Sequence, residues 1–447
     1  MVGADVTVLS PPATLPRRLG AIAATGTLVG IMVGSGIFRI PSTVAAAVPS
    51  PAGFMAVWLV GGLLALSGAL LFGELAAMFP DTGGRYVYLR EGVHPVAAFA
   101  YAVGSILMLR PVSLSARSLL IAAYVGTLVP ALAGREVVTA AGIIVLLSAM
   151  NYRSVLLGAG VATFTSAAKV LALLLLAGLV LSSAPAVPDV AVAQGAVTLK
   201  GFGLALVTVM WTYSGWGSTT YISGEVRNAE RTMPRVLMLG VGFVVLLFLL
   251  INWTYLHVLP LSTIAASDTV ATDAATAAMG PTAGRVVALL VVISVLGSLS
   301  GTMLASPRLP FAVGSDAPRL GMLAKVHQAY GTPHASVVLT ASLALLFLFT
   351  LRNFEQLVEG YILGSWPFYV LVAMGYFRLR RRRPEAARPF RTPGHPVVPG
   401  FFLLASAAMV LNAVVADPIG AITGSWPMLV GIPVYYLVRV RAPGAIR

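Results

Sequence analysis

Apolar stretches long enough to cross a lipid bilayer follow one another along this chain, with only short polar segments between them. A bilayer core of about 30 Å needs roughly 20 apolar residues in a helix. Twelve such stretches can be read in the sequence, at 18–47, 54–79, 95–130, 136–150, 160–183, 200–224, 236–259, 284–313, 334–350, 355–377, 400–416 and 425–440. We therefore predict an all-α integral membrane protein with about 12 transmembrane helices.

Composition agrees with a lipid environment. Of 447 residues, 58% are hydrophobic and 10% are charged, whereas a soluble domain carries about 25% charged residues. The first apolar run is too long for a removable signal peptide and has no small-residue cleavage site, so we expect it in the mature protein.

Basic residues predict the topology. With twelve spans, every second connecting segment lies on the same side of the membrane as the two termini. Basic residues gather in these segments, above all in 378–399, whereas the segments on the opposite side hold few of them. By the positive-inside rule, both termini are predicted to be cytoplasmic. This arrangement and anionic lipid headgroups account for the net charge of +14, so no nucleic-acid partner is expected.

Several chemistries lack the residues they need. The chain contains no cysteine, which excludes disulfides, thiol catalysis and cysteine-metal sites. The five histidines stand singly, without metal-ligand spacing, and we expect no metal or cofactor. No P-loop or soluble ATPase domain is evident. Transport driven directly by ATP is not expected, and ionisable residues within the spans are too few to favour an enzyme.

Two spans are interrupted by small residues. "GIMVGSGIFRIPS" at 30–42 places Gly34, Ser35 and Gly36 inside the first span, and Ser214, Gly215 and Gly217 interrupt the sixth. Broken backbone is tolerated in a membrane only where it is buried in protein or lines a cavity. The other interpretation of "GSG" is a small-residue face for helix packing.

Breaks at corresponding positions of two five-span halves are typical of inverted-repeat transporters. The predicted organisation is a tail at 1–17, a first repeat at 18–183, a second at 200–377, a basic cytoplasmic loop at 378–399, two further helices at 400–440 and a tail at 441–447.

Ordered fragments resemble the amino acid, polyamine and organocation transporter superfamily, and its L-type amino acid transporter branch in particular. They span nearly the whole chain and include "GIMVGSGIFRIPS", "GELAAMFPDTGGRYVYLREG", "LRPVSLSARSLLIAAY", "TYSGWGSTTYISGEVRNAERTMPRVL", "GSLSGTMLASPRLPFAVGSDAPRLGML" and "RRRPEAARPFRTPGHPVVPG". The resemblance implies a leucine-transporter-type fold of two inverted five-helix repeats, with helices 1 and 6 broken, plus two C-terminal helices.

The resemblance also implies a substrate site at the breaks. The α-carboxylate of an amino acid would meet the backbone at Gly34, Ser35 and Gly36, and its ammonium would meet carbonyls of Trp211, Thr212 and Ser214. Half-helix N-termini do favour anions, and exposed carbonyls favour cations. The full set expected to line this site is Met32, Gly34, Ser35, Gly36, Ile37, Trp211, Thr212, Ser214 and Gly215.

Lys169 lies in the middle of the fifth span, where a lysine costs about 2.5 to 3.5 kcal/mol on insertion scales. By resemblance, its ammonium stands in for a sodium ion and ties the fifth span to the first and eighth. Because burial favours the neutral amine, proton coupling through Lys169 is the competing hypothesis. Snorkelling to an interface is a third interpretation.

Trp211 occupies the gate position where relatives commonly have phenylalanine, and its larger ring predicts a preference for small neutral substrates. Glu74, Arg110 and Glu225 are ionisable groups in or near the spans. For these three we favour ion pairing or loop anchoring over substrate contact, because intramembrane charges usually pair.

The sequence thus predicts a sodium-independent secondary transporter of neutral, small L-amino acids that works by alternating access, as an exchanger or uniporter. A proton-coupled symporter using Lys169 is one alternative, and a membrane amino acid sensor without translocation is another. We expect a multi-pass protein of the inner, or plasma, membrane without a disulfide-linked accessory subunit, since animal members of the branch use a cysteine that this chain lacks.

Overall fold

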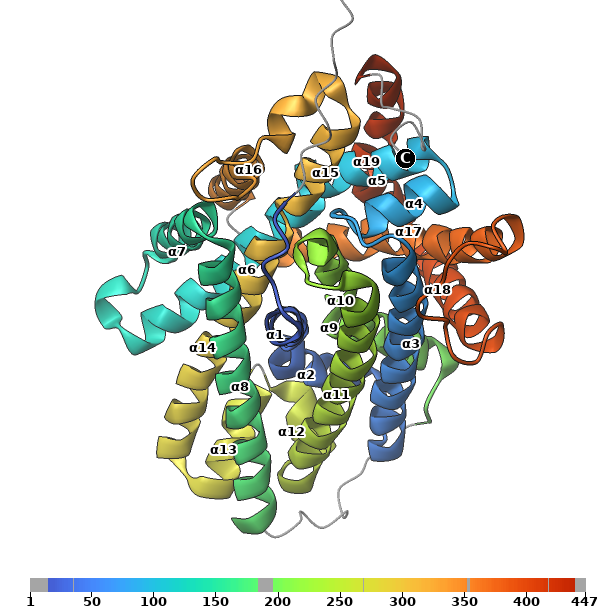
Figure 1. The fold of residues 1–447 in the computed structure, drawn as a ribbon. Helices are drawn as coiled ribbons and strands as arrows, with labels where there is room; N and C mark the ends of the chain where they lie inside the picture. Colours follow the sequence, from blue (N-terminus) through green and yellow to red (C-terminus); the bar gives the residue numbers. More distant parts are fainter. Residues whose placement is uncertain are drawn as a thin grey trace, which may run out of the picture.

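The computed structural model describes residues 15–34, 36–183, 196–267, 269–351, 354–416 and 418–438. Ser35, most of the predicted N-terminal tail and the whole segment 441–447 lie outside these residues. Helices dominate the described part (Figure 1). Their bounds are α1 (Ala21–Met32), α2 (Gly36–Ala47), α3 (Pro51–Met78), α4 (Arg85–Gly92), α5 (Pro95–Gly104), η1 (Ser105–Leu109), α6 (Arg110–Leu128), η2 (Pro130–Leu132), α7 (Glu136–Arg153), α8 (Val155–Ser183), α9 (Leu199–Tyr213), α10 (Trp216–Thr219), η3 (Thr220–Glu225), α11 (Ala229–Val258), α12 (Leu261–Ala266), α13 (Val270–Met279), α14 (Pro281–Ala305), α15 (Arg308–Asp316), η4 (Pro318–Ala324), α16 (His334–Leu351), α17 (Phe354–Arg382), α18 (Val397–Ala416) and α19 (Pro418–Val438).

Each apolar stretch predicted as a span coincides with a helix or with helices in series. The stretch 95–130 consists of α5, the π-helical turn η1 and α6 in direct succession. Within the described residues, seven helical runs are long and apolar enough to cross a membrane. The structure therefore agrees with an all-α membrane protein, while the number of crossings and the inverted repeat stay predictions.

Three short helices between the spans were not predicted: α4, α12 and α13. Their sequences lack a long apolar run, and turn geometry bounds them instead. α13, for example, ends at Gly280, which has a φ of 86° that glycine adopts without steric cost. Hydropathy alone gives no signal for such helices.

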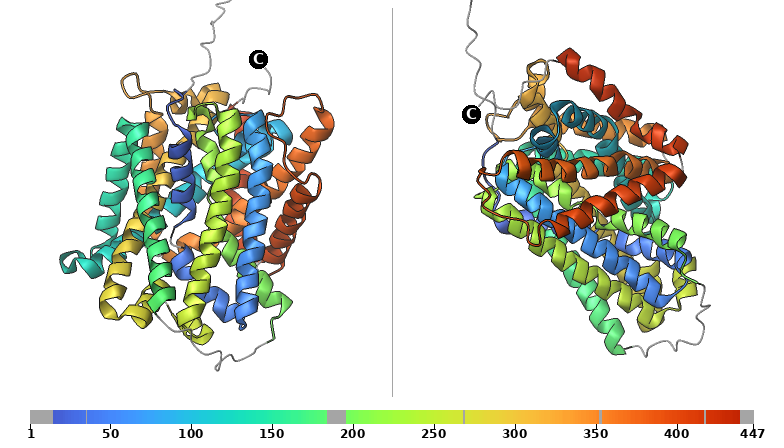
Figure 2. Two further views of the ribbon diagram at one scale, coloured as in Figure 1. Left: turned by 60° about the horizontal axis from the view of Figure 1, so that its bottom comes forward. Right: turned by 90° about the vertical axis from the view of Figure 1, so that its right-hand side faces the viewer.

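α1 lies at the centre of the molecule (Figure 1). It packs against α8, α11 and α14, while α2 packs against α9 and α12. α3 and α11 run side by side (Figure 2). On the other side of α1, α6 and α7 pack against each other, and each contacts both α14 and α16. The second broken helix is enclosed as well, because α9 packs against α2 and α3, and α10 against α1, α3 and α14. Broken backbone is tolerated in a membrane at such enclosed positions.

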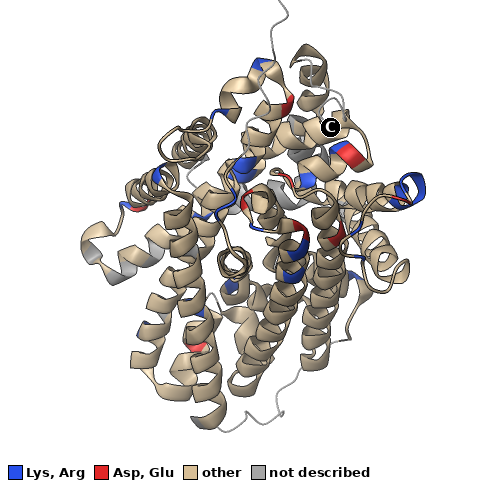
Figure 3. Ribbon diagram, in the orientation of Figure 1, with Lys and Arg blue, Asp and Glu red and all other residues tan. Residues whose placement is uncertain are grey.

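The two ends of the described chain lie on the same side. Arg18 donates a hydrogen bond to the carbonyl of Tyr330 at 3.4 Å, and Arg319 donates to the carbonyl of Leu437. Arg319 and Tyr330 both belong to the connection between α15 and α16. This arrangement fits an even number of spans, and many basic residues lie in this half of the molecule (Figure 3).

Candidate substrate site

The first helix ends at Met32. Val33 leaves the helical region with φ −78° and ψ 76°, although its N–H still donates to the carbonyl of Val29 at 2.8 Å. The N–H of Gly34 then turns back to the carbonyl of Met32 at 2.9 Å. Because the last carbonyls of a helix have no helical partner, the others near this break need donors from elsewhere.

Lys169 of α8 supplies one such donor. Its ammonium donates to the carbonyls of Gly30 at 2.7 Å and Val33 at 2.5 Å, and to Ser294 of α14 at 3.4 Å. The side chain is 1% exposed. The cation therefore joins α8, α1 and α14 through backbone oxygens, as the resemblance implied. This position does not fit snorkelling to an interface.

Ser298 of α14 supplies a second donor to the break. Its hydroxyl donates to the carbonyl of Ile31 at 3.2 Å and accepts a hydrogen bond from Nη1 of Arg117 at 2.9 Å. Arg117 also donates to Thr302 Oγ1 at 2.5 Å. The carbonyl end of α1 is thus held by side chains from α8 and α14, and Arg117 of α6 supports the Ser298 side chain.

The second break separates α9 from α10 at Ser214 and Gly215. Gly215 has φ 123°, a conformation that favours glycine. The carbonyl of Trp211 accepts hydrogen bonds from both the N–H and the hydroxyl of Ser214, at 3.1 and 2.6 Å. The carbonyls of Thr212 and Ser214 accept no hydrogen bond from other described residues.

The two breaks meet. A side chain at Gly36, the first residue of α2, would place its Cβ 2.6 Å from Oγ1 of Thr212. A side chain at Gly215 would place its Cβ 2.7 Å from Ile31. Glycine is therefore required at both positions for the half-helices to approach so closely. The Thr212 hydroxyl, buried at this junction, has no hydrogen-bond partner among the described residues.

The other residues expected at this site surround the same junction. Met32 and Ile37 are buried on either side of the first break, and Trp211 is half-buried one turn before the second. Gly34 lies against α14, because a Cβ there would be 2.8 Å from Ser298 Oγ. Ser35 lies outside the described residues.

The sequence profile of the amino acid permease family matches residues 19–438. This chain belongs to that family. The permease is 28% identical to human b(0,+)-type amino acid transporter 1 over 413 residues, covering 91% of this chain and 84% of the relative. It is 27% identical to the serine/threonine exchanger SteT of Bacillus subtilis (strain 168) over 433 residues, covering 96% and 98%. The human cystine/glutamate transporter is 26% identical over 433 residues, covering 95% and 85%.

These matches confirm the amino acid, polyamine and organocation superfamily and its L-type branch. They also establish the permease as a multi-pass membrane protein of amino acid transport, in a family of carriers and not of enzymes.

Glu225 of the permease does not take part in the junction. Its carboxylate accepts two hydrogen bonds from Arg308, at 2.6 Å from Nε and 2.9 Å from Nη2, and both side chains are fully buried. Arg110 donates to Ser218 Oγ at 3.1 Å and lies over the Tyr221 ring at 4.5 Å. The ion-pair interpretation is confirmed for Glu225.

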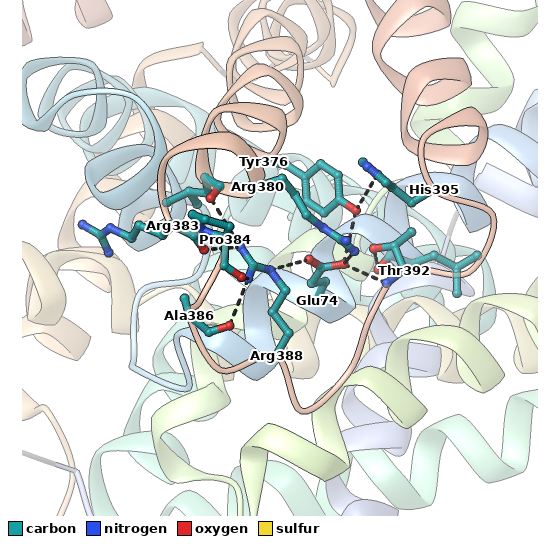
Figure 4. Close-up of polar contacts among 11 residues, drawn as sticks. Glu74, Tyr376, Arg380, Arg383, Pro384, Ala386, Arg388, Thr392 and His395 are labelled. Carbon is teal, nitrogen blue, oxygen red and sulfur yellow. Dashed lines mark hydrogen bonds and ion pairs between the residues drawn. The ribbon is translucent and has the colours of Figure 1, made fainter.

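Glu74 anchors the segment that follows α17 (Figure 4). Its carboxylate accepts hydrogen bonds from Arg380 at 2.6 Å and from the N–H of Thr392 at 2.7 Å, and Arg388 Nε lies 3.3 Å away. The Tyr376 hydroxyl donates to it at 3.2 Å. Ion pairing and loop anchoring are therefore both confirmed for Glu74.

His395 completes this contact, with Nδ1 3.2 Å from the Tyr376 hydroxyl. Desolvation and the nearby Arg380 cation lower the pKa of the His395 imidazole below its usual value of 6.5, against an opposing effect of Glu74. The ring is therefore neutral at pH 7 and adds no charge to the basic segment.

Sequence reasoning missed Ser298, Thr302 and Arg117 as supports of the first break. A signal was present, because "GSLSGT" at 297–302 places small and hydroxyl-bearing residues inside an apolar helix. Such residues in membrane helices mark close packing and interhelical hydrogen bonds. The partner of Ser298, the carbonyl end of α1, could be identified only from the fold.

Proposed function

We propose that this permease carries small neutral L-amino acids across the membrane by alternating access, without sodium, as an exchanger or uniporter. The observation that carries the proposal is the junction of two broken helices at the Thr212 hydroxyl, which is buried and lacks a partner among the described residues. A buried polar atom without a partner costs free energy, and a polar substrate can supply the missing hydrogen bond.

The two charged groups of an amino acid have matching places at this junction. The first N–H groups of α2, from Gly36 onward, have no helical acceptor and favour a carboxylate. The carbonyls of Thr212 and Ser214 favour an ammonium. Met32, Ile37 and Trp211 surround the junction with apolar side chains, and these would lie next to the side chain of the substrate. This division supports a neutral substrate of modest size.

Lys169 supports independence from sodium. Its ammonium already occupies the carbonyls of Gly30 and Val33, at 2.7 and 2.5 Å, which are ligands of the type that sodium would use. Together with the carbonyl of Ser294, these oxygens join the ammonium to both α1 and α14, an arrangement that suits a fixed structural cation.

Counterflow in proteoliposomes tests the proposal. Vesicles loaded with unlabelled L-alanine, in buffer with potassium in place of sodium, should take up labelled L-alanine in a transient overshoot. Competition by serine, threonine, leucine, tryptophan, arginine and glutamate then measures selectivity. Binding of L-alanine without counterflow would support the sensor alternative, and uptake that requires sodium would contradict the assigned role of Lys169.

A matched pair of variants locates the site. Thr212→Val removes the buried hydroxyl while keeping the shape, and should weaken alanine binding by about tenfold, the loss of one hydrogen bond of about 1.4 kcal/mol. Thr208→Val removes a hydroxyl from the exposed face of the same helix, where it bonds only to Leu204 of its own turn. Equal affinities in the two variants would contradict the proposed site.

The proposal includes the membrane location and the topology of the permease. We place the permease in the inner, or plasma, membrane with both termini in the cytoplasm, on the strength of its basic segments. Since the chain contains no cysteine, we also propose that it works without a disulfide-linked accessory subunit.

A further inference from the structure

A groove with an unusual combination of walls lies between the end of α17 and the start of α18. Its volume is about 580 Å³. One wall consists of apolar side chains, including Met374, Phe377 and Leu404, and the other of three arginines, Arg378, Arg381 and Arg382. Met374 and Leu404 are 53% and 71% exposed, as expected for side chains that face acyl chains.

The three arginines of this groove differ in their hydrogen-bond partners. Arg378 donates to the carbonyl of Val93 at 2.7 Å. The side chains of Arg381 and Arg382 are exposed, and neither guanidinium makes a hydrogen bond or ion pair with another described residue. Figure 3 shows this end of α17 as a prominent basic region. Two guanidinium groups are thus available to a ligand at the point where an apolar helix leaves the predicted span.

A second hollow continues the basic side of the groove. It has a volume of about 340 Å³, shares Arg378 and Arg382 with the groove, and reaches the turn between α4 and α5 at His94. Polar space therefore adjoins the arginines on one side, and apolar space adjoins them on the other. A ligand that fills both must carry an anionic head and an apolar tail.

We propose that this groove binds an anionic phospholipid, with its phosphate between Arg381 and Arg382 and an acyl chain along Met374, Phe377 and Leu404. Basic pockets between helices at a membrane surface bind anionic headgroups by this combination of charge and apolar contact. Arginine also suits phosphate, because its planar group donates two parallel hydrogen bonds. The site lies on α17 and α18, away from the helix breaks.

Native mass spectrometry of the detergent-purified permease tests this site. Titration with phosphatidylglycerol should give bound lipid at concentrations where phosphatidylcholine does not. Arg381→Gln/Arg382→Gln should weaken phosphatidylglycerol binding by about tenfold or more, since each arginine near the surface contributes to attraction. The matched control Arg231→Gln/Arg235→Gln removes two exposed cations from the start of α11 and should leave binding unchanged.

A second variant tests the apolar wall without changing charge. Gly400 lines the groove, and a Cβ added there meets no atom within 4 Å, so Gly400→Trp should fill the groove and reduce lipid binding. Gly242→Trp, at an equally open position on α11, is its control. The proposal would be overturned if Arg381→Gln/Arg382→Gln bound lipid as well as Arg231→Gln/Arg235→Gln, or if Gly400→Trp bound it as well as Gly242→Trp. Displacement of the lipid by millimolar inorganic phosphate would also overturn it, and would identify a site for free phosphate.

Discussion

Two buried cations of this permease are stabilised in opposite ways. Arg308 faces the carboxylate of Glu225 through two hydrogen bonds, and both side chains are 0% exposed. Lys169, at 1% exposure, is held by backbone carbonyls of Gly30, Val33 and Ser294. The first cation is neutralised by a side chain, whereas the second depends on the shape of the backbone.

This difference suggests that Arg308 has a structural role and that Lys169 takes part in conformational change. The carbonyls of Gly30 and Val33 are open to Lys169 because α1 ends at Met32, so any movement of that break changes the surroundings of the cation. The Glu225 and Arg308 pair keeps its hydrogen bonds as long as η3 and α15 stay together. We therefore expect changes at Arg308 to affect folding first, and changes at Lys169 to affect transport first.

The largest effect should come from breaking the ion pair on one side. Arg308→Met leaves the Glu225 carboxylate buried and unpaired, which costs about 3 to 5 kcal/mol. We expect poor recovery of folded protein, measured by fluorescence size-exclusion chromatography and by the midpoint of thermal unfolding. Glu225→Met/Arg308→Met should recover most of the loss, because apolar replacement of a whole pair is often neutral. A double variant no more stable than Arg308→Met would show that the unpaired Glu225 carboxylate does not cause the loss of stability.

Lys169→Ala should impair transport more than folding, the opposite of Arg308→Met. It leaves carbonyls at the break without donors, at about 1 to 3 kcal/mol for a buried group, so we expect folded protein with counterflow below a tenth of wild type. An imposed pH gradient should not drive alanine accumulation in the wild type. Accumulation driven by the gradient, lost in Lys169→Ala while exchange survives, would instead identify Lys169 as the proton carrier.

These two cations also show what the sequence can predict. A lysine inside an apolar span and two interruptions by glycine are local signals, and they located α8 and both breaks correctly. The partners of Glu225 and Glu74 were beyond reach, because Arg308 follows Glu225 by 83 residues and Arg380 follows Glu74 by 306. Hydropathy assigns residues to helices, but the neighbours of a helix are set by side-chain packing across the whole bundle.

Gly36→Val tests the junction without removing a charge. Its Cβ would lie 2.6 to 2.9 Å from three atoms of the Thr212 side chain, so the half-helices must separate and binding should be lost while folded yield changes little. The control is Gly203→Val, also near a helix end, where an added Cβ meets no atom within 4 Å. Alanine binding, measured by scintillation proximity, compares the two. Wild-type affinity in folded Gly36→Val would show that the first break is a packing face and not a binding site.

The smallest effect that we expect is a change of selectivity at Trp211. This side chain is half-buried beside the second break, and phenylalanine in its place leaves more room for the substrate. Because a methylene-sized change in a pocket alters discrimination by roughly 10-fold or more, Trp211→Phe should improve competition by leucine relative to alanine by about that factor. Trp253→Phe, at a tryptophan that is 57% exposed on α11, controls for loss of an indole elsewhere. An unchanged leucine-to-alanine ratio in Trp211→Phe would mean that Met32 and Ile37, and not the indole, limit the size of the substrate.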